Sequence, residues 1–225
     1  MREQRRFAEA LPLYQRALSI REKILGPNDP AVAVSLSGLG AIQSELGEFA
    51  LARTLLERAL VIDKGIYGSN HPTVAIDFNN LAVLLKDEGK PDEALTLFER
   101  ALAISEAAYG PNHPQVASIS CNMAVLLDHG QPDQLKRALA LAKRARAINE
   151  AQRPDHPVAD ESRSLARDLK AQRRCRTCQA LGSARVTIMT CTNCMNEWYC
   201  SAKCQKKDWG HHKAECAKPA AVVEA

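Results

Sequence analysis

Residues His71–Leu85 read HPTVAIDFNNLAVLL, and their pattern predicts the secondary structure of the repeated part of the chain. The apolar side chains of Leu81, Leu84 and Leu85 stand three and four positions apart. That is the spacing of one face of an α-helix, not the alternation of a β-strand. Pro72 suits the first turn of a helix, where its missing N–H group costs nothing. The stretch therefore predicts an amphipathic helix that begins near Pro72.

The same pattern recurs along the chain with a period of 42 residues. Segments that open on Gly26, Gly68 and Gly110 read GPNDPAVAVSL, GSNHPTVAIDF and GPNHPQVASIS. A second helical series lies between them, as in EFALARTLLERALVI and PDEALTLFERALAI. Each unit is thus predicted to be a hairpin of two helices. Because one hairpin cannot bury its apolar face alone, the units must stack, and we expect an all-α helical-hairpin solenoid.

Glycine and proline mark the predicted helix ends. The first helices should stop near Gly47, Gly89 and Gly130, while Pro91 and Pro132 suit the openings of second helices. In the recurring GxNxP motif, the glycine should end a second helix and the proline should open the next hairpin.

The repeat resembles the tetratricopeptide repeats of kinesin light chains, whose period of 42 and HPxVAxxxNNLAxLL hairpins are matched by residues 71–85. The resemblance extends over residues 5 to 172. The first unit differs from the family pattern, because it has SLSGLG where the family has an LNNLA-like run. It implies a tetratricopeptide solenoid over residues 1–172. The chain opens on RFAEALPLYQRALSI, which matches only a second helix. We therefore expect an array that is truncated at its N-terminus.

Two asparagines of the first helices are candidate peptide-binding residues. Asn80 and Asn122 occupy the same position of successive units. In the resembled family, an asparagine at this position hydrogen-bonds the backbone of an extended peptide, and an amide can both donate and accept. Gly38 takes the equivalent place in the first unit and cannot do this. A peptide-binding role and a purely structural role are both open at this point.

Other recurring or unusual residues are predicted to be structural. His71 and His113 each precede a proline at a helix start, where Asp29, a good capping residue, stands in the first unit. Cys121 has no partner cysteine nearby in the sequence, and we expect a small side chain on or within a helix rather than a reactive thiol.

Seven of the eight cysteines lie between residues 175 and 216. An odd number cannot pair fully as disulfides, whereas one added histidine makes eight ligands, enough for two tetrahedral zinc ions. His212 stands four residues from Cys216, so both can share one helix face; His211 does not. The predicted zinc ligands are Cys175, Cys178, Cys191, Cys194, Cys200, Cys204, His212 and Cys216.

This ligand series looks like a MYND-type zinc finger, in the order Cx2C, twelve residues, Cx2C, five, Cx3C, seven, Hx3C. We assign residues 173–217 to the finger and residues 218–225 to a tail. Spacing alone leaves open which ligands share a metal. Two full sites leave no position for a catalytic water. The resemblance implies interleaving, with one zinc on Cys175, Cys178, Cys200 and Cys204 and the other on Cys191, Cys194, His212 and Cys216.

The resemblance also implies a peptide site on the finger, because MYND fingers with known ligands take short proline-rich peptides. The matching positions are Thr192, Gln205 and Trp209. Threonine replaces the serine of the family and adds a methyl group, which leaves the pocket width open. Trp209 could instead pack in the small core of the finger.

Charge argues against nucleic acid as the main partner. The net charge is +4, and residues 171–225 hold nine basic and four acidic side chains. Seven thiolates and two zinc ions would reduce that surplus to about two, too little for a phosphate-driven binder. No apolar run is long enough to span a membrane.

We therefore expect a non-enzymatic, zinc-binding adaptor that binds proteins or peptides and no small-molecule substrate. It should be intracellular, in the cytoplasm or nucleus. One rival is a fragment of a SET and MYND lysine methyltransferase, but that family places its repeats after the finger, and no methyl-donor motif is present. The other rival is a transcriptional regulator, which would need specific DNA binding.

Overall fold

The computed structural model forms two compact units, Met1–Leu126 and Leu127–Ala225. The residues that the structure describes are 2–129, 132–152, 163–166, 169, 189–190 and 198–199.

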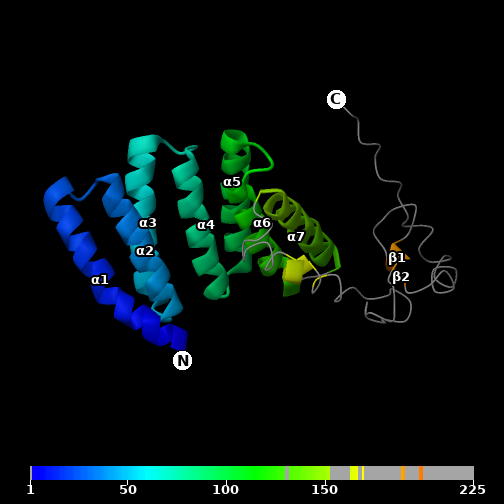
Figure 1. Ribbon diagram of the computed structural model, residues 1–225, viewed down its shortest axis with the longest axis horizontal. Helices are drawn as coiled ribbons and strands as arrows, with labels where there is room; N and C mark the ends of the chain where they lie inside the picture. The colour runs from blue at the N-terminus through cyan, green and yellow to red at the C-terminus, as the bar shows by residue number, and fades with distance from the viewer. Residues whose placement is uncertain are drawn as a thin grey trace. The chain divides into compact units, whose positions relative to one another are not determined.

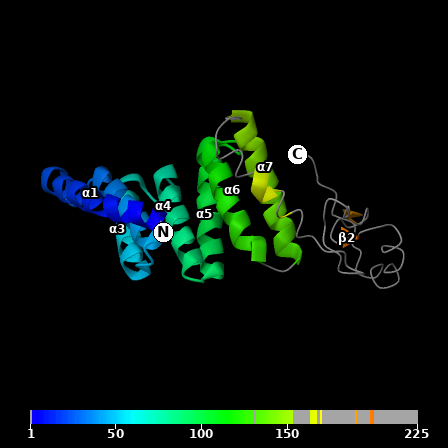
Figure 2. The same cartoon turned by 60° about the horizontal axis from the view of Figure 1, so that its bottom comes forward.

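Six helices make up the first unit. Helices that follow one another in the chain pack against each other (Figure 1, Figure 2). Helix α2 packs on α3 and α4 packs on α5, so each pair is a hairpin, and α3 packs on α4 to join the hairpins. The predicted all-α helical-hairpin solenoid is confirmed. The helices are α1 (Arg2–Leu25), α2 (Pro30–Glu45), α3 (Phe49–Tyr67), α4 (Pro72–Asp87), α5 (Pro91–Tyr109) and α6 (Pro114–Leu126).

The helix ends follow the glycines and prolines of the sequence. Gly47 and Gly89 stand just after α2 and α4 with φ angles of 84° and 77°, a conformation that favours glycine. Prolines open α2, α4, α5 and α6, as expected. Gly130 lies outside the described residues. Helix α6 is shorter than α2 and α4, and a 3-10 turn, η1 (Leu127–His129), follows it.

Side chains of both helices of each hairpin build the core, and some of those from the second helices also reach the next hairpin. Leu56 of α3 packs against Leu81 and Leu84 of α4 and is 3% exposed. A Cβ atom added to Gly40 would stand 2.7 Å from Leu56 Cγ. The glycine therefore allows α2 and α3 to approach closely, and a larger residue would push them apart.

Helix α1 corresponds to the second helices α3 and α5, and equivalent apolar side chains are more exposed on α1 than on α5. Tyr14 and Ile20 of α1 are 43% and 46% exposed, whereas the equivalent Phe98 and Ile104 of α5 are 0% and 7% exposed. The Tyr14 ring lies where a side chain at Gly38 would be, with Tyr14 Cε1 only 2.5 Å from an added Cβ. A side chain at Gly38 would therefore meet this ring.

The described part of the second unit contains η1, α7 (Pro132–Gln152) and two short strands, β1 (Met189–Thr190) and β2 (Trp198–Tyr199). The strands are antiparallel, with Met189 opposite Tyr199. This ladder lies in the segment predicted to be the finger. Among the described helices, none has the length and apolar character needed to cross a membrane.

Candidate peptide-binding face

The first helices each present a stripe of three positions that are four and three residues apart, which places them on one side of a helix. Helix α2 contacts α4, and α4 contacts α6, so the stripes lie on neighbouring helices. We call this surface the first-helix face. It consists of Val34, Gly38 and Ala41 on α2, Ile76, Asn80 and Val83 on α4, and Ser118, Asn122 and Val125 on α6.

The two predicted asparagines both belong to this face. Asn80 and Asn122 are half-buried, and Asn122 Nδ2 donates a hydrogen bond to Asn79 Oδ1 of α4 at 2.9 Å. This bond fixes the Asn122 amide and leaves its oxygen as an acceptor. Among the described residues, none hydrogen-bonds the Asn80 amide. The structure therefore brings the two amides onto one surface.

A buried pair of carboxyl groups lies between α3 and α4. Asp63 of α3 and Asp77 of α4 are each 3% exposed, and Ser37 Oγ of α2 donates to Asp77 Oδ1 at 3.4 Å. Burial, followed by repulsion from the Asp63 carboxylate, raises the pKa of Asp77 to about 7. Burial also raises the pKa of Asp63. The pair therefore holds a proton at mildly acidic pH and loses it as the pH rises through about 7.

Sequence reasoning missed this pair, although the repeat contains a signal. One repeat earlier, where α1 packs on α2, the equivalent positions are Arg21 and Ser35. Their side chains are hydrogen-bonded at 2.5 Å. Polar residues at aligned positions of two facing helices indicate a polar contact between successive hairpins.

The recurring histidines are structural, as expected. His71 Nδ1 accepts the backbone N–H of Thr73 at 3.2 Å, which caps α4, and His113 Nδ1 does the same for α6. The His71 ring also stacks on Tyr67 with ring centroids 4.5 Å apart, an interaction that the sequence pattern did not reveal. The histidines therefore tie the end of one hairpin to the start of the next.

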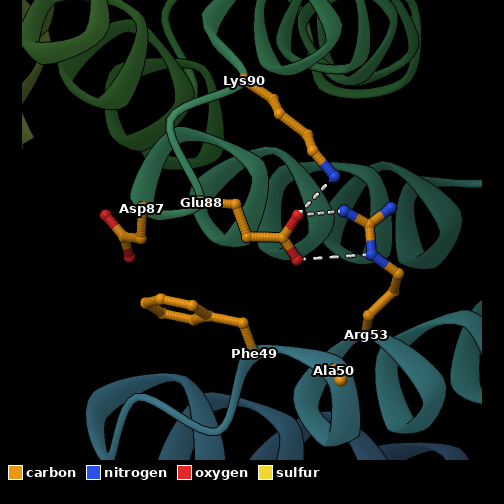
Figure 3. Close-up of a pocket in the computed structure, with 6 residues that line it drawn as sticks. All are labelled: Phe49, Ala50, Arg53, Asp87, Glu88 and Lys90. Carbon is orange, nitrogen blue, oxygen red and sulfur yellow. Dashed lines mark hydrogen bonds and ion pairs between the residues drawn. The ribbon is translucent and has the colours of Figure 1, made fainter.

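A pocket of about 520 Å³ opens between the start of α3 and the turn after α4 (Figure 3). The Glu88 carboxylate accepts hydrogen bonds from the Arg53 guanidinium and lies 2.9 Å from Lys90 Nζ. The bond from Arg53, aided by that from Lys90, lowers the pKa of Glu88. Because Glu88 pairs with Arg53 of α3 and with Lys90, this cluster links successive hairpins. The lining residues are Phe49, Ala50, Arg53, Asp87, Glu88 and Lys90.

The eight predicted zinc ligands lie outside the described residues, as do Thr192, Gln205 and Trp209. Within the described part of the chain, no three histidine, cysteine or acidic side chains come together to hold a metal ion.

The family model of the tetratricopeptide repeat matches residues 1–65, 45–105 and 73–151, more than half of the chain. The chain belongs to the tetratricopeptide repeat family. In this tetratricopeptide repeat protein, residues 172–216 also match the MYND finger, which confirms the second predicted module. MYND fingers are zinc-binding modules, so the match supports zinc as the metal of this segment.

Solved structures support the repeat fold. A Podosopora anserina protein with nearly identical TPR-like repeats, described as a putative kinesin light chain, is 24% identical with a TM-score of 0.57. The match covers 75% of this chain and 80% of that one. BtubC (BKLC) of P. vanneervenii is 25% identical with a TM-score of 0.53, and the match covers 76% of this chain and 75% of BtubC. A search of curated proteins found no match.

Tetratricopeptide repeats and MYND fingers both serve in protein–protein interaction. The chain is therefore a protein-interaction adaptor built from two modules.

Proposed function

We propose that this adaptor has two peptide sites, one on the repeats and one on the zinc finger. The repeats bind an extended peptide on the first-helix face, where Asn80 and Asn122 hydrogen-bond its backbone. The observation that supports this role is the bond from Asn122 to Asn79, which holds one amide in place before a ligand arrives. A preorganised amide loses little conformational entropy on binding.

Replacing both Asn80 and Asn122 by alanine should weaken peptide binding about 30-fold. Each lost hydrogen bond contributes about 1 kcal/mol, and about 1.4 kcal/mol corresponds to a tenfold change in affinity. An array of extended and proline-rich peptides, probed with the intact protein, would identify ligands, and fluorescence anisotropy would then give dissociation constants.

The matched control is a double replacement of Asn28 and Asn70, two exposed asparagines in the turns between hairpins. This control also removes two asparagine side chains, but from positions outside the first-helix face. The affinity for the peptide should therefore stay unchanged. Equal losses in the two double variants would contradict a role for the face.

The finger holds two zinc ions in this proposal, on the eight ligands and in the interleaved arrangement predicted above. The β1–β2 ladder bears on the placement of Cys191 and Cys200, which fall on different metals in both the interleaved and the consecutive pairing. Cys191 directly follows β1 and Cys200 directly follows β2, and antiparallel strands finish at opposite ends of their ladder. These two cysteines are therefore expected to serve different metals.

A second peptide site on the finger takes a proline-rich segment through Thr192, Gln205 and Trp209. A Trp209→Ala change should weaken binding of such a peptide about 30-fold, because a tryptophan anchor in an interface contributes about 2 kcal/mol or more. Proline-rich peptides suit this role because their extended helix is already formed before binding. Isothermal titration with a peptide selected on the array would measure the loss.

Zinc content separates binding from folding in this test. A Trp209→Ala protein that keeps two zinc ions and loses the peptide supports a binding role. Loss of zinc together with the peptide would indicate that Trp209 packs the finger, and unchanged binding would remove Trp209 from the site.

A further inference from the structure

The first helices differ from the second helices in their charge. Helix α2 carries one ionisable side chain, Glu45 at its C-terminal end, and α6 carries no charged residue. In α4 the charged residues are the buried Asp77 and two in the last turn, Lys86 and Asp87. The second helices α3 and α5 each contain five charged residues. The charges of this part of the chain are therefore concentrated away from the first-helix face.

The positions of the face on either side of the central row of amides are mostly apolar. Val34, Ile76 and Val125 are 64%, 43% and 42% exposed. In α2 and α4, apolar residues stand on both sides of the central position, whereas α6 has Val125 on one side and the small, uncharged Ser118 on the other. A peptide backbone lying on the amide row would place its side chains on these uncharged positions.

A charged side chain of a ligand would lose hydration on this surface and find no opposite charge on the face to replace it. Burying an ion without a partner costs several kcal/mol, whereas apolar side chains gain from the same contact. The face therefore discriminates against both acidic and basic peptides.

The repeat of the face also suits a particular backbone. Packed helices lie about 8–10 Å apart, and three residues of a polyproline II segment advance about 9 Å. Residues of the ligand that are three positions apart would then contact equivalent positions on α2, α4 and α6. One such row, formed by Ala41, Val83 and Val125, is apolar on all three helices. A segment that crosses α2, α4 and α6 would need about seven residues.

We infer that the first-helix face selects an uncharged, extended segment of a partner protein, with apolar side chains at every third residue. This inference rests on the peptide-binding function proposed above and specifies the ligand class. The repeats are therefore expected not to prefer acidic or basic peptides.

The test compares three synthetic peptides of equal length, an uncharged one with valine at every third position, the same peptide with two glutamates, and the same peptide with two lysines. We expect the intact protein to bind the uncharged peptide at least about tenfold more tightly than either charged form. Its affinity should stay constant between about 0.05 M and about 0.5 M NaCl, because no ion pair is screened.

Two lysine substitutions provide a matched pair of variants. Val34 and Val61 are exposed to similar extents, 64% and 70%, but Val34 lies on the face and Val61 lies on α3. We expect Val34→Lys to weaken binding of the uncharged peptide about tenfold and to favour the glutamate peptide, whereas Val61→Lys should change neither.

The outcomes separate this inference from the proposed function. If the charged peptides bind as well as the uncharged one, and the Asn80 and Asn122 changes still weaken binding, the face binds peptides but the ligand class is wrong. If no peptide depends on the two asparagines, the proposed function itself fails. Equal effects of Val34→Lys and Val61→Lys would also overturn the inference.

Discussion

Replacing His212 by alanine is expected to remove one of two zinc ions from the chain and to unfold much of the finger. The change leaves three ligands in one site, and a structural zinc site needs four. Structural zinc contributes on the order of 10 kcal/mol per site to modules of this kind. The loss should appear as about one zinc ion per chain by elemental analysis and as new sensitivity of residues 173–217 to protease.

His211 provides the closest control that the chain offers. It is the same residue one position away, and its replacement by alanine should leave both zinc ions bound. A Cys121→Ser change controls for general loss of thiols, because Cys121 lies on α6 of the repeats. Equal zinc loss in the His211 and His212 variants, or fewer than two zinc ions in the unaltered protein, would refute the ligand assignment.

Replacing Asp77 by asparagine should stabilise the repeats at neutral and higher pH, by about 2 kcal/mol at pH 8. The pKa of Asp77 rises from 3.8 to about 7 on folding. A shift of that size corresponds to about 4 kcal/mol of preference for the neutral form. Asparagine is neutral at every pH and can still accept the Ser37 hydrogen bond, but incomplete hydrogen bonding of the buried amide reduces the gain.

The direction of the pH dependence follows from proton binding. Folding raises the pKa of Asp77, so the folded chain holds a proton that the unfolded chain releases above about pH 4. The contribution of this carboxyl group to stability is fully present below its unfolded pKa of 3.8 and is lost as the pH rises through about 7. Lys64 moderates the loss by attracting the carboxylate. In the Asp77→Asn variant the decline should become smaller, and the raised pKa of Asp63 should leave the remainder.

Urea unfolding followed by circular dichroism at several pH values between about 5 and 8 would measure the effect. Asp92 on α5 is exposed, and Asp92→Asn should retain the decline of the unaltered protein. An Asp77→Asn variant that is less stable than the unaltered protein at pH 8 would show that the ionised pair stabilises the junction.

Much of the fold could be predicted because the features that define it are local. The GxNxP turns predicted helix starts and ends, and the 42-residue period predicted the hairpins. The capping role of His71 followed from its place before Pro72, and the bond to the Thr73 N–H confirms it. The stacking of His71 on Tyr67 was not predicted, because it depends on how two helices meet.

The candidate site was predicted less completely. The sequence identified Asn80 and Asn122 as equivalent positions but did not show that Asn79 binds one of them. It contained Gly38 as an exception but did not show that the ring of Tyr14 lies against this position. Both contacts are between residues of different helices, so the sequence did not reveal them.

The sequence by itself determined the repeat, the helix ends and the ligand series of the finger, because each depends on neighbours within one turn or on fixed spacing. The tertiary structure decided which polar groups meet. Asp63 and Asp77 come together only when the hairpins stack. The same is true of the hydrogen bond between the Asn122 and Asn79 side chains, which joins α6 to α4. Packing also determines which side chains are exposed. Because α2, α4 and α6 lie next to one another, their uncharged stripes form a single surface.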